Sequence, residues 1–145
     1  MRFWDTSALV PLIVEEPTTA AMRDLVAQDG DVVVWLFTSV ELLSTLGRLG
    51  RMASGLEDVL PTARREVMDL SARCITVTHI AEVKRRAERL VSVHPLTAAD
   101  ALQLAAASVA SGDRPETLEF VTLDQVLARA ARLEGFPVLG ESRAS

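Results

Sequence analysis

Short apolar runs alternate with segments of helical periodicity along the chain, and this alternation restricts the possible folds more than any other feature. Apolar and β-branched runs predict strands at Phe3–Trp4, Val32–Phe37, Ile75–Val77, Leu118–Thr122 and, at an edge, Pro137–Leu139. Apolar residues three or four positions apart predict helices over Ser7–Val14, from Pro17 and Thr18 onward, and over Thr38–Leu49, Glu57–Arg73, Ala81–Val91, Thr97–Ala110 and Asp124–Glu134. Alternation of this kind is typical of an α/β protein whose strands are joined by right-handed crossovers. We therefore predict a three-layer α/β/α sandwich with a mostly parallel central sheet.

Length and composition favour one soluble domain over residues 1–145. A chain of 145 residues with 49% apolar content can bury a core of its own, and no repeat or linker divides it. The single cysteine, Cys74, cannot form an internal disulfide and is expected to be a buried, inert thiol in a reducing cytoplasm. No signal peptide is predicted, and no apolar run approaches the roughly 18 residues of a membrane helix. We expect a cytoplasmic protein without a membrane partner.

The net charge of −5 argues against a protein that holds long nucleic acid mainly by neutralising phosphates. It does not exclude a nuclease, because carboxylates that bind metal make a chain acidic while a separate basic face contacts the phosphates.

Four carboxylates occupy equivalent places where a predicted strand passes into a helix. Asp5 ends the first strand, and Asp124 follows the strand that ends at Thr122. Glu41 and Asp100 each lie in the first turn of a predicted helix. In a parallel sheet these joins meet at one edge, so we expect the four side chains to converge although they are far apart in sequence.

Helix capping is a simpler explanation for each of these acids. Thr38-x-x-Glu41 and Thr97-x-x-Asp100 match a capping box or its close variant, and Asp5 and Asp124 can serve as N-caps. Capping leaves unexplained why acids, rather than the equally effective Ser or Asn, stand at several joins on one edge.

Grouped carboxylates imply a cation. Close carboxylates raise one another's pKa unless a cation lies between them, and an oxygen-only ligand set favours Mg²⁺, or Mn²⁺, over zinc. Such an ion generates hydroxide and neutralises charge on a phosphate, so phosphodiester hydrolysis is the chemistry that fits.

The segments around these acids resemble the PIN-domain nucleases, and in particular the VapC-type toxins of bacterial toxin–antitoxin pairs. The matching segments appear in family order and are Trp4–Leu9, Thr38–Leu43, Leu96–Ala105 and Phe120–Ala131. The long region Glu57–Arg73 and the loop Ser111–Glu119 depart mildly from the family pattern.

The resemblance implies a PIN fold, Mg²⁺-dependent endoribonuclease activity on RNA, a homodimer, and inhibition by a cognate antitoxin. It also implies metal-binding and catalytic roles for Asp5, Glu41, Asp100 and, as a fourth and less tightly held acid, Asp124. Two polar positions, Ser7 and Thr122, are expected to orient carboxylates or water.

Two other functions remain open. A haloacid-dehalogenase-like phosphatase or a receiver domain also places an acid after a strand, but it needs a lysine at a strand end, and the only lysine, Lys84, lies in a basic predicted helix. A PIN-like scaffold that binds RNA or protein without cutting is the second alternative. Cleavage of RNA that disappears in Asp5→Asn would separate an enzyme from a scaffold.

The remaining conspicuous residues favour structural roles. The basic run from Lys84 to Arg89, with Arg64–Arg65, Arg48 and Arg51, can guide phosphates, but such a run is more often a solvated face held by ion pairs, here Glu82 with Arg86. His79 and His94 lack metal-ligand spacing and are expected at helix ends or in loops. Trp4 and Trp35 are expected in the core.

Overall fold

The computed structural model describes residues 1–52 and 60–141, and these residues form a five-stranded parallel sheet in the order β3-β2-β1-β4-β5. The strands are β1 (Arg2–Trp4), β2 (Val32–Trp35), β3 (Ile75–Val77), β4 (Glu119–Val121) and β5 (Val138–Leu139). The predicted parallel α/β fold is confirmed. Because the strand order reverses between β1 and β4, the carboxyl ends of these two strands border the crevice in which open α/β sheets place their sites.

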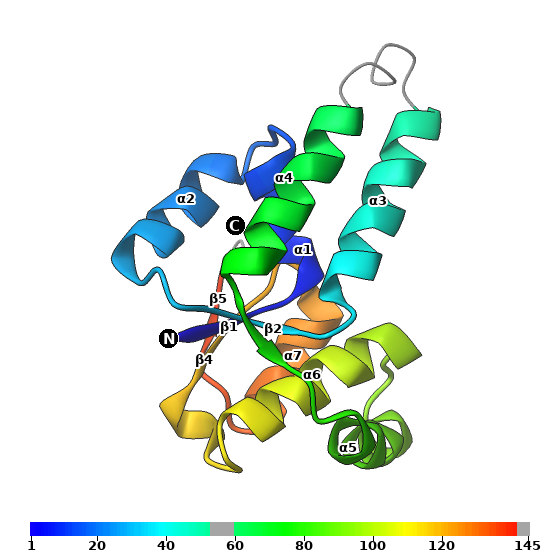
Figure 1. Cartoon of the computed structure of the whole chain (residues 1–145). Helices are drawn as coiled ribbons and strands as arrows, with labels where there is room; N and C mark the ends of the chain where they lie inside the picture. The colour runs from blue at the N-terminus through cyan, green and yellow to red at the C-terminus, as the bar shows by residue number, and fades with distance from the viewer. Residues whose placement is uncertain (53–59, 142–145) are drawn as a thin grey trace.

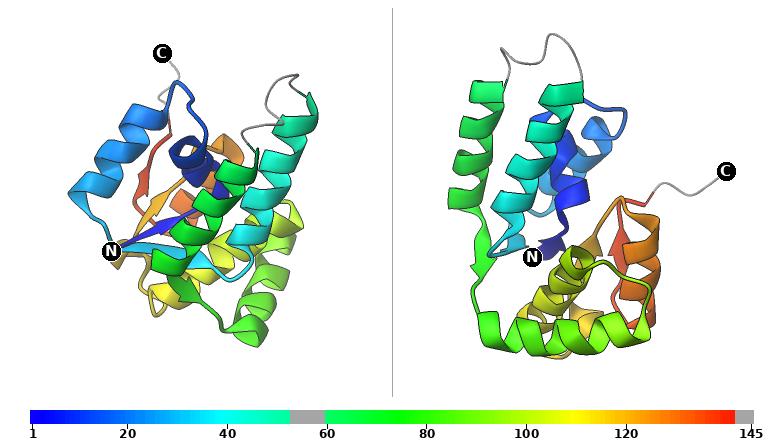
Figure 2. Two further views of the ribbon diagram at one scale, coloured as in Figure 1. Left: turned by 45° about the horizontal axis from the view of Figure 1, so that its top comes forward. Right: turned by 90° about the vertical axis from the view of Figure 1, so that its right-hand side faces the viewer.

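Seven helices of the described chain cover the two faces of the sheet (Figures 1 and 2). They are α1 (Thr6–Ile13), α2 (Thr19–Gln28), α3 (Thr38–Met52), α4 (Leu60–Arg73), α5 (Ile80–Val93), α6 (Ala98–Ala110) and α7 (Gln125–Leu133), with a 3₁₀ turn at Pro115–Thr117. Helices α1–α4 lie on one face and α5–α7 on the other, while α3 and α4 run side by side away from the sheet.

The alternation of side chains along each strand builds two cores. Phe3 and Trp35 face the core under α5–α7, whereas Trp4 and Val34 face the core under α1–α4. All four side chains are at most 5% exposed, so the prediction that both tryptophans belong to the core is confirmed. Two apolar faces on one sheet require helices on both sides, which gives the three-layer sandwich.

Several element ends differ from the predicted ones. The second strand ends at Trp35 rather than Phe37, because the chain turns there: Leu36 N–H donates to Val77 O, and Phe37 lies 45% exposed with its ring edge-on to Trp35. The fourth strand is also shorter than predicted. The predicted helix start at Glu57 lies outside the described residues.

No described helix combines the length and the apolar character needed to cross a bilayer.

Candidate active site

Asp5 lies at the carboxyl end of β1 and begins α1. Its Oδ2 accepts hydrogen bonds from Ser7 Oγ (2.6 Å), from Ser7 N–H (3.2 Å) and from Thr122 Oγ1 (3.0 Å). The side chain is buried, and burial raises its pKa to about 6 in spite of these hydrogen bonds, which lower it; the charge of Asp100 raises it further. Asp5 is thus both the N-cap of α1 and a carboxylate held in a largely dry place.

Two hydroxyl groups join Asp5 to the loop that follows β4. Ser7 Oγ and Thr122 Oγ1 lie 3.2 Å apart, and each also accepts a backbone N–H from this loop: Leu123 donates to Ser7, and Asp124 donates to Thr122. The loop that carries Asp124 is therefore tied to Asp5 across the β1–β4 crevice.

Glu41 stands in the first turn of α3 and is half-buried. Its Oε2 accepts from Thr6 Oγ1 (2.7 Å) and from Gln103 Nε2 (3.1 Å). Burial raises the pKa of Glu41, these two hydrogen bonds lower it, and the charge of Asp100 raises it. The capping-box alternative for residues 38 and 41 is wrong, because Glu41 reaches across to α1 and α6 instead of back to Thr38.

Asp100 and Asp124 each lie at the start of a helix, and Asp124 follows β4 as predicted. The prediction that Asp100 lies at a strand-to-helix join is wrong, because α6 follows α5. Asp100 N–H donates to Thr97 Oγ1 (3.2 Å), as half of the predicted capping box, and Asp124 Oδ1 accepts from Leu127 N–H (2.8 Å) as the N-cap of α7. Capping and a second role are compatible for Asp124, because its cap bond occupies only Oδ1.

Asp100 interacts electrostatically with each of the other three acids. Burial raises its pKa, and the charge of Asp124 raises it further, while Asp100 in turn raises the pKa of Asp5 and of Glu41. Each of the other three acids is therefore near enough to Asp100 for the two charges to repel, which is the reason to expect a cation beside Asp100.

The chemistry of the donors fits a hard divalent cation, since the group supplies carboxylate and hydroxyl oxygens without sulfur or imidazole. Within the described part of the chain, no three His, Cys, Asp or Glu side chains lie close enough to hold a metal ion in their present orientations. A shared cation would therefore require these side chains to rotate toward one another.

The sequence assigned no role to Thr6 or Gln103, and it assigned Thr38 only a capping role. Thr6, Thr38 and Gln103 are all buried and share hydrogen bonds beneath Glu41. One signal was available for Gln103: it is an amide in an alanine-rich helix, three residues after Asp100 and therefore on the same side of α6. The local sequence does not predict which helices meet at Gln103, because this depends on tertiary packing.

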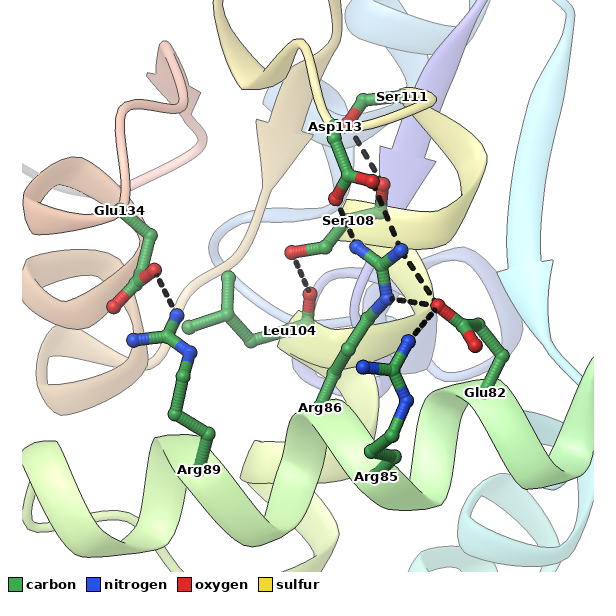
Figure 3. A network of polar contacts seen from close by, with 9 residues as sticks. All are labelled: Glu82, Arg85, Arg86, Arg89, Leu104, Ser108, Ser111, Asp113 and Glu134. Carbon is green, nitrogen blue, oxygen red and sulfur yellow. Dashed lines mark hydrogen bonds and ion pairs between the residues drawn. The ribbon is translucent and has the colours of Figure 1, made fainter.

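The predicted basic run on α5 is a solvated face that acids neutralise (Figure 3). Lys84 pairs with Glu88 (2.7 Å), Arg85 pairs with Glu82 (2.6 Å), and Arg86 pairs with Glu82 (2.8 Å) and with Asp113. Glu134 takes the last cation of the run, Arg89, at 2.5 Å. The prediction that ion pairs hold this face is confirmed.

The two histidines and the cysteine lie away from the acids' hydrogen bonds. His79 and His94 flank α5, as expected of helix-end residues, and His94 Nε2 lies 2.6 Å from Glu134 Oε1. Cys74 is half-buried rather than fully buried, and burial raises the pKa of its thiol, which agrees with an inert cysteine.

Comparison with known proteins gives a family match and several structural matches. The sequence profile of the PIN domain matches residues 2–133. No curated protein sequence matches the chain significantly. Three solved structures have a similar fold: FitAcB from Neisseria gonorrhoeae, with 20% identity, TM-score 0.65 and 96% of each chain covered; a toxin–antitoxin complex from Klebsiella pneumoniae, with 21% identity, TM-score 0.62 and 96% of each chain covered; and PAE2754 from Pyrobaculum aerophilum, with 21% identity, TM-score 0.62, and 94% of this chain and 87% of that chain covered.

Proposed function

Because this chain belongs to the PIN domain family, a family of nucleases, we propose that it is a metal-dependent endoribonuclease that hydrolyses phosphodiester bonds of RNA. One observation carries the proposal: Asp100 interacts with acids from three other segments, since its charge raises the pKa of Asp5 and of Glu41 and the charge of Asp124 raises the pKa of Asp100. A purely capping role for these acids would not require three of them to lie near enough to Asp100 to repel it.

Asp5, Glu41 and Asp100 would hold Mg²⁺, or Mn²⁺, directly, and Asp124 would contribute directly or through water. When bound, the ion supplies an activated water and neutralises charge on the phosphate. The chain's own part is to orient the carboxylates: Ser7 and Thr122 fix Asp5, and their link to the following loop fixes the backbone of Asp124.

We further propose that the protein is a VapC-type toxin of a bacterial toxin–antitoxin pair. The support is the resemblance of the four acidic segments and the similar fold of a chain from a toxin–antitoxin complex. A cognate antitoxin that covers the acidic edge, a homodimer, a single domain over residues 1–145 and a cytoplasmic location belong to the same proposal.

Cleavage of single-stranded RNA by the purified chain tests the enzyme. We expect cleavage with Mg²⁺ or Mn²⁺, none with EDTA, and loss of most turnover in Asp5→Asn, Glu41→Gln and Asp100→Asn. Asp24→Asn is the matched control, because Asp24 is an exposed acid on α2. RNA binding that Asp5→Asn leaves unchanged, together with no cleavage by any form, would support the non-catalytic scaffold instead.

Expression in bacteria tests the toxin. Growth arrest with new RNA ends is expected when the chain is expressed alone, and growth should recover when a cognate antitoxin is co-expressed. Arrest that persists in Asp5→Asn would contradict a toxin that acts by cleavage.

A further inference from the structure

Gln103 is a fully buried amide at the centre of an alanine-rich helix. It lies on α6, three residues after Asp100, so the two side chains leave the same side of the helix about one turn apart. Its Nε2 lies 3.0 Å from Thr6 Oγ1, 3.2 Å from Thr38 Oγ1 and 3.1 Å from Glu41 Oε2. One amide group thus connects α6 with α1 and α3.

The orientation of this amide follows from its partners. An ionised Glu41 can only accept hydrogen bonds, so the nitrogen of Gln103 must face it; the opposite rotation would place two acceptors against each other. The carbonyl oxygen of Gln103 then has no partner among the described residues, although it is buried. A buried unpaired acceptor costs stability, and a methionine would fill the same space without that cost. The N–H donor is therefore what this position requires.

The donor controls one oxygen of Glu41 and leaves the other free. Gln103 and Thr6 both donate to Oε2, and Oε1 has no hydrogen-bond partner among the described residues. Two donors on one oxygen fix the rotation of the carboxylate plane.

The side chain of Gln103 is connected to the segments that carry three of the proposed ligands. Thr6 follows Asp5 directly, Glu41 is a partner itself, and Asp100 is one turn away on the helix of Gln103. A change in the side chain of residue 103 would therefore alter the spacing of Asp5, Glu41 and Asp100 together.

We propose that Gln103 is a positioning residue for the divalent-cation site: its N–H group holds Glu41 Oε2 and Thr6 so that Glu41 Oε1 is directed to the cation. This role rests on the function proposed above. Partners of this kind, which orient a metal ligand without touching the metal, typically contribute a factor of about 10–100 to metal affinity.

The test compares Gln103→Met, which keeps the length of the side chain and removes the donor, with Leu104→Met, which alters packing at the next buried position of α6. Three quantities are measured on the full chain: the Mn²⁺ dissociation constant by calorimetry without RNA, the free energy of unfolding by urea without cation, and kcat and KM for RNA cleavage. We expect Gln103→Met to bind Mn²⁺ about 10- to 100-fold more weakly and to lose kcat with KM for RNA unchanged, whereas Leu104→Met keeps its Mn²⁺ affinity.

If Gln103→Met does not fold, Thr6→Val replaces it, since this change removes the other donor to Glu41 Oε2 at constant volume, and weaker Mn²⁺ binding is again expected. Mn²⁺ affinity equal to that of the wild type in whichever variant folds would overturn the positioning role while the wild-type enzyme stays active. A wild type that neither binds Mn²⁺ nor cleaves RNA would overturn the proposed function, and the positioning role with it.

Discussion

Asp5 shows at the scale of one residue how capping and a reactive site combine. The sequence predicted a carboxylate after the first strand, and the resemblance pointed to Ser7 and Thr122 as polar neighbours; both hydroxyls contact Asp5. Thr6 and Gln103 could not be assigned in the same way, because their role arises only where α1, α3 and α6 meet.

Replacing Asp5 by Asn should stabilise the cation-free protein at neutral pH. The pKa of Asp5 is raised from 3.8 to about 6 in the fold, so the native state binds its proton more tightly than the unfolded state does. The stability that the protonated form provides is present below pH 3.8 and is lost as the pH rises through 6. This loss amounts to about 3 kcal/mol of unfolding free energy. Asn at position 5 does not ionise and therefore does not lose this stability. Urea unfolding in EDTA should therefore give Asp5→Asn a larger free energy of unfolding than the wild type at neutral pH. The difference should vanish as the pH falls to about 4 and below. An Asn variant that is less stable at neutral pH would show that the ionised carboxylate has a structural role.

At the scale of elements, helix α7 shows that one acid can cap its own helix and also interact with a neighbouring acid. Asp124 caps α7 through Oδ1, and the helix that it begins packs against the sheet. The position of Asp124 could be predicted because strand–helix joins have a distinctive sequence. The hydrogen bond from its backbone N–H to Thr122 Oγ1 could not be predicted.

Two substitutions at Asp124 separate its capping role from its charge. Asp124→Ser keeps a hydroxyl acceptor for the helix N-terminus and should leave stability nearly unchanged, whereas Asp124→Ala should lose about 1 kcal/mol. Both remove the carboxylate, so we expect the two variants to lose the same amount of Mn²⁺ affinity in calorimetry. Wild-type affinity in the Ser variant would restrict Asp124 to capping.

Helix α5 should contribute little to RNA binding despite its basic sequence. Its cations are paired with acids, and Lys84 and Arg85 are exposed, so removing either should leave the free energy of unfolding nearly unchanged. The double variant Lys84→Ala/Arg85→Ala, made in the non-cleaving Asp5→Asn background, should keep the salt dependence of RNA affinity that the Asp5→Asn protein has. A slope of log K against log salt that falls by about one per cation removed would show direct phosphate contacts instead.

At the scale of the whole molecule, the sequence predicted the order of strands and helices and the parallel sheet. It did not predict where β2 ends, because the apolar run continues through Leu36 and Phe37 after the chain has turned toward Val77. Strand order depends on pairing between distant segments and left no local signal. The places of Asp5, Glu41 and Asp124, by contrast, follow from parallel strands, because each comes after a strand. Asp100 does not, because its helix α6 follows α5, and its place depends on how α6 packs.

Divalent cation should stabilise the fold only where the acids are ionised. Because the pKa values of Asp5, Glu41 and Asp100 are all raised, protonation competes with the cation at a higher pH than for ordinary carboxylates. At pH values above 7, Mg²⁺ should raise the melting temperature clearly, whereas near pH 5 it should have little effect on the melting temperature. An equal shift at both values would place the bound ion elsewhere.

Locating Mn²⁺ by anomalous scattering in crystals of the full chain tests the central claim most directly, since that claim is a shared cation among acids from separate segments. We predict one strong anomalous peak within coordination distance of Asp5 and Asp100, with Glu41 Oε1 turned toward it, and no such peak in Asp5→Asn. A peak at another place, or carboxylates of Asp5, Glu41 and Asp100 that stay apart at saturating Mn²⁺, would contradict it.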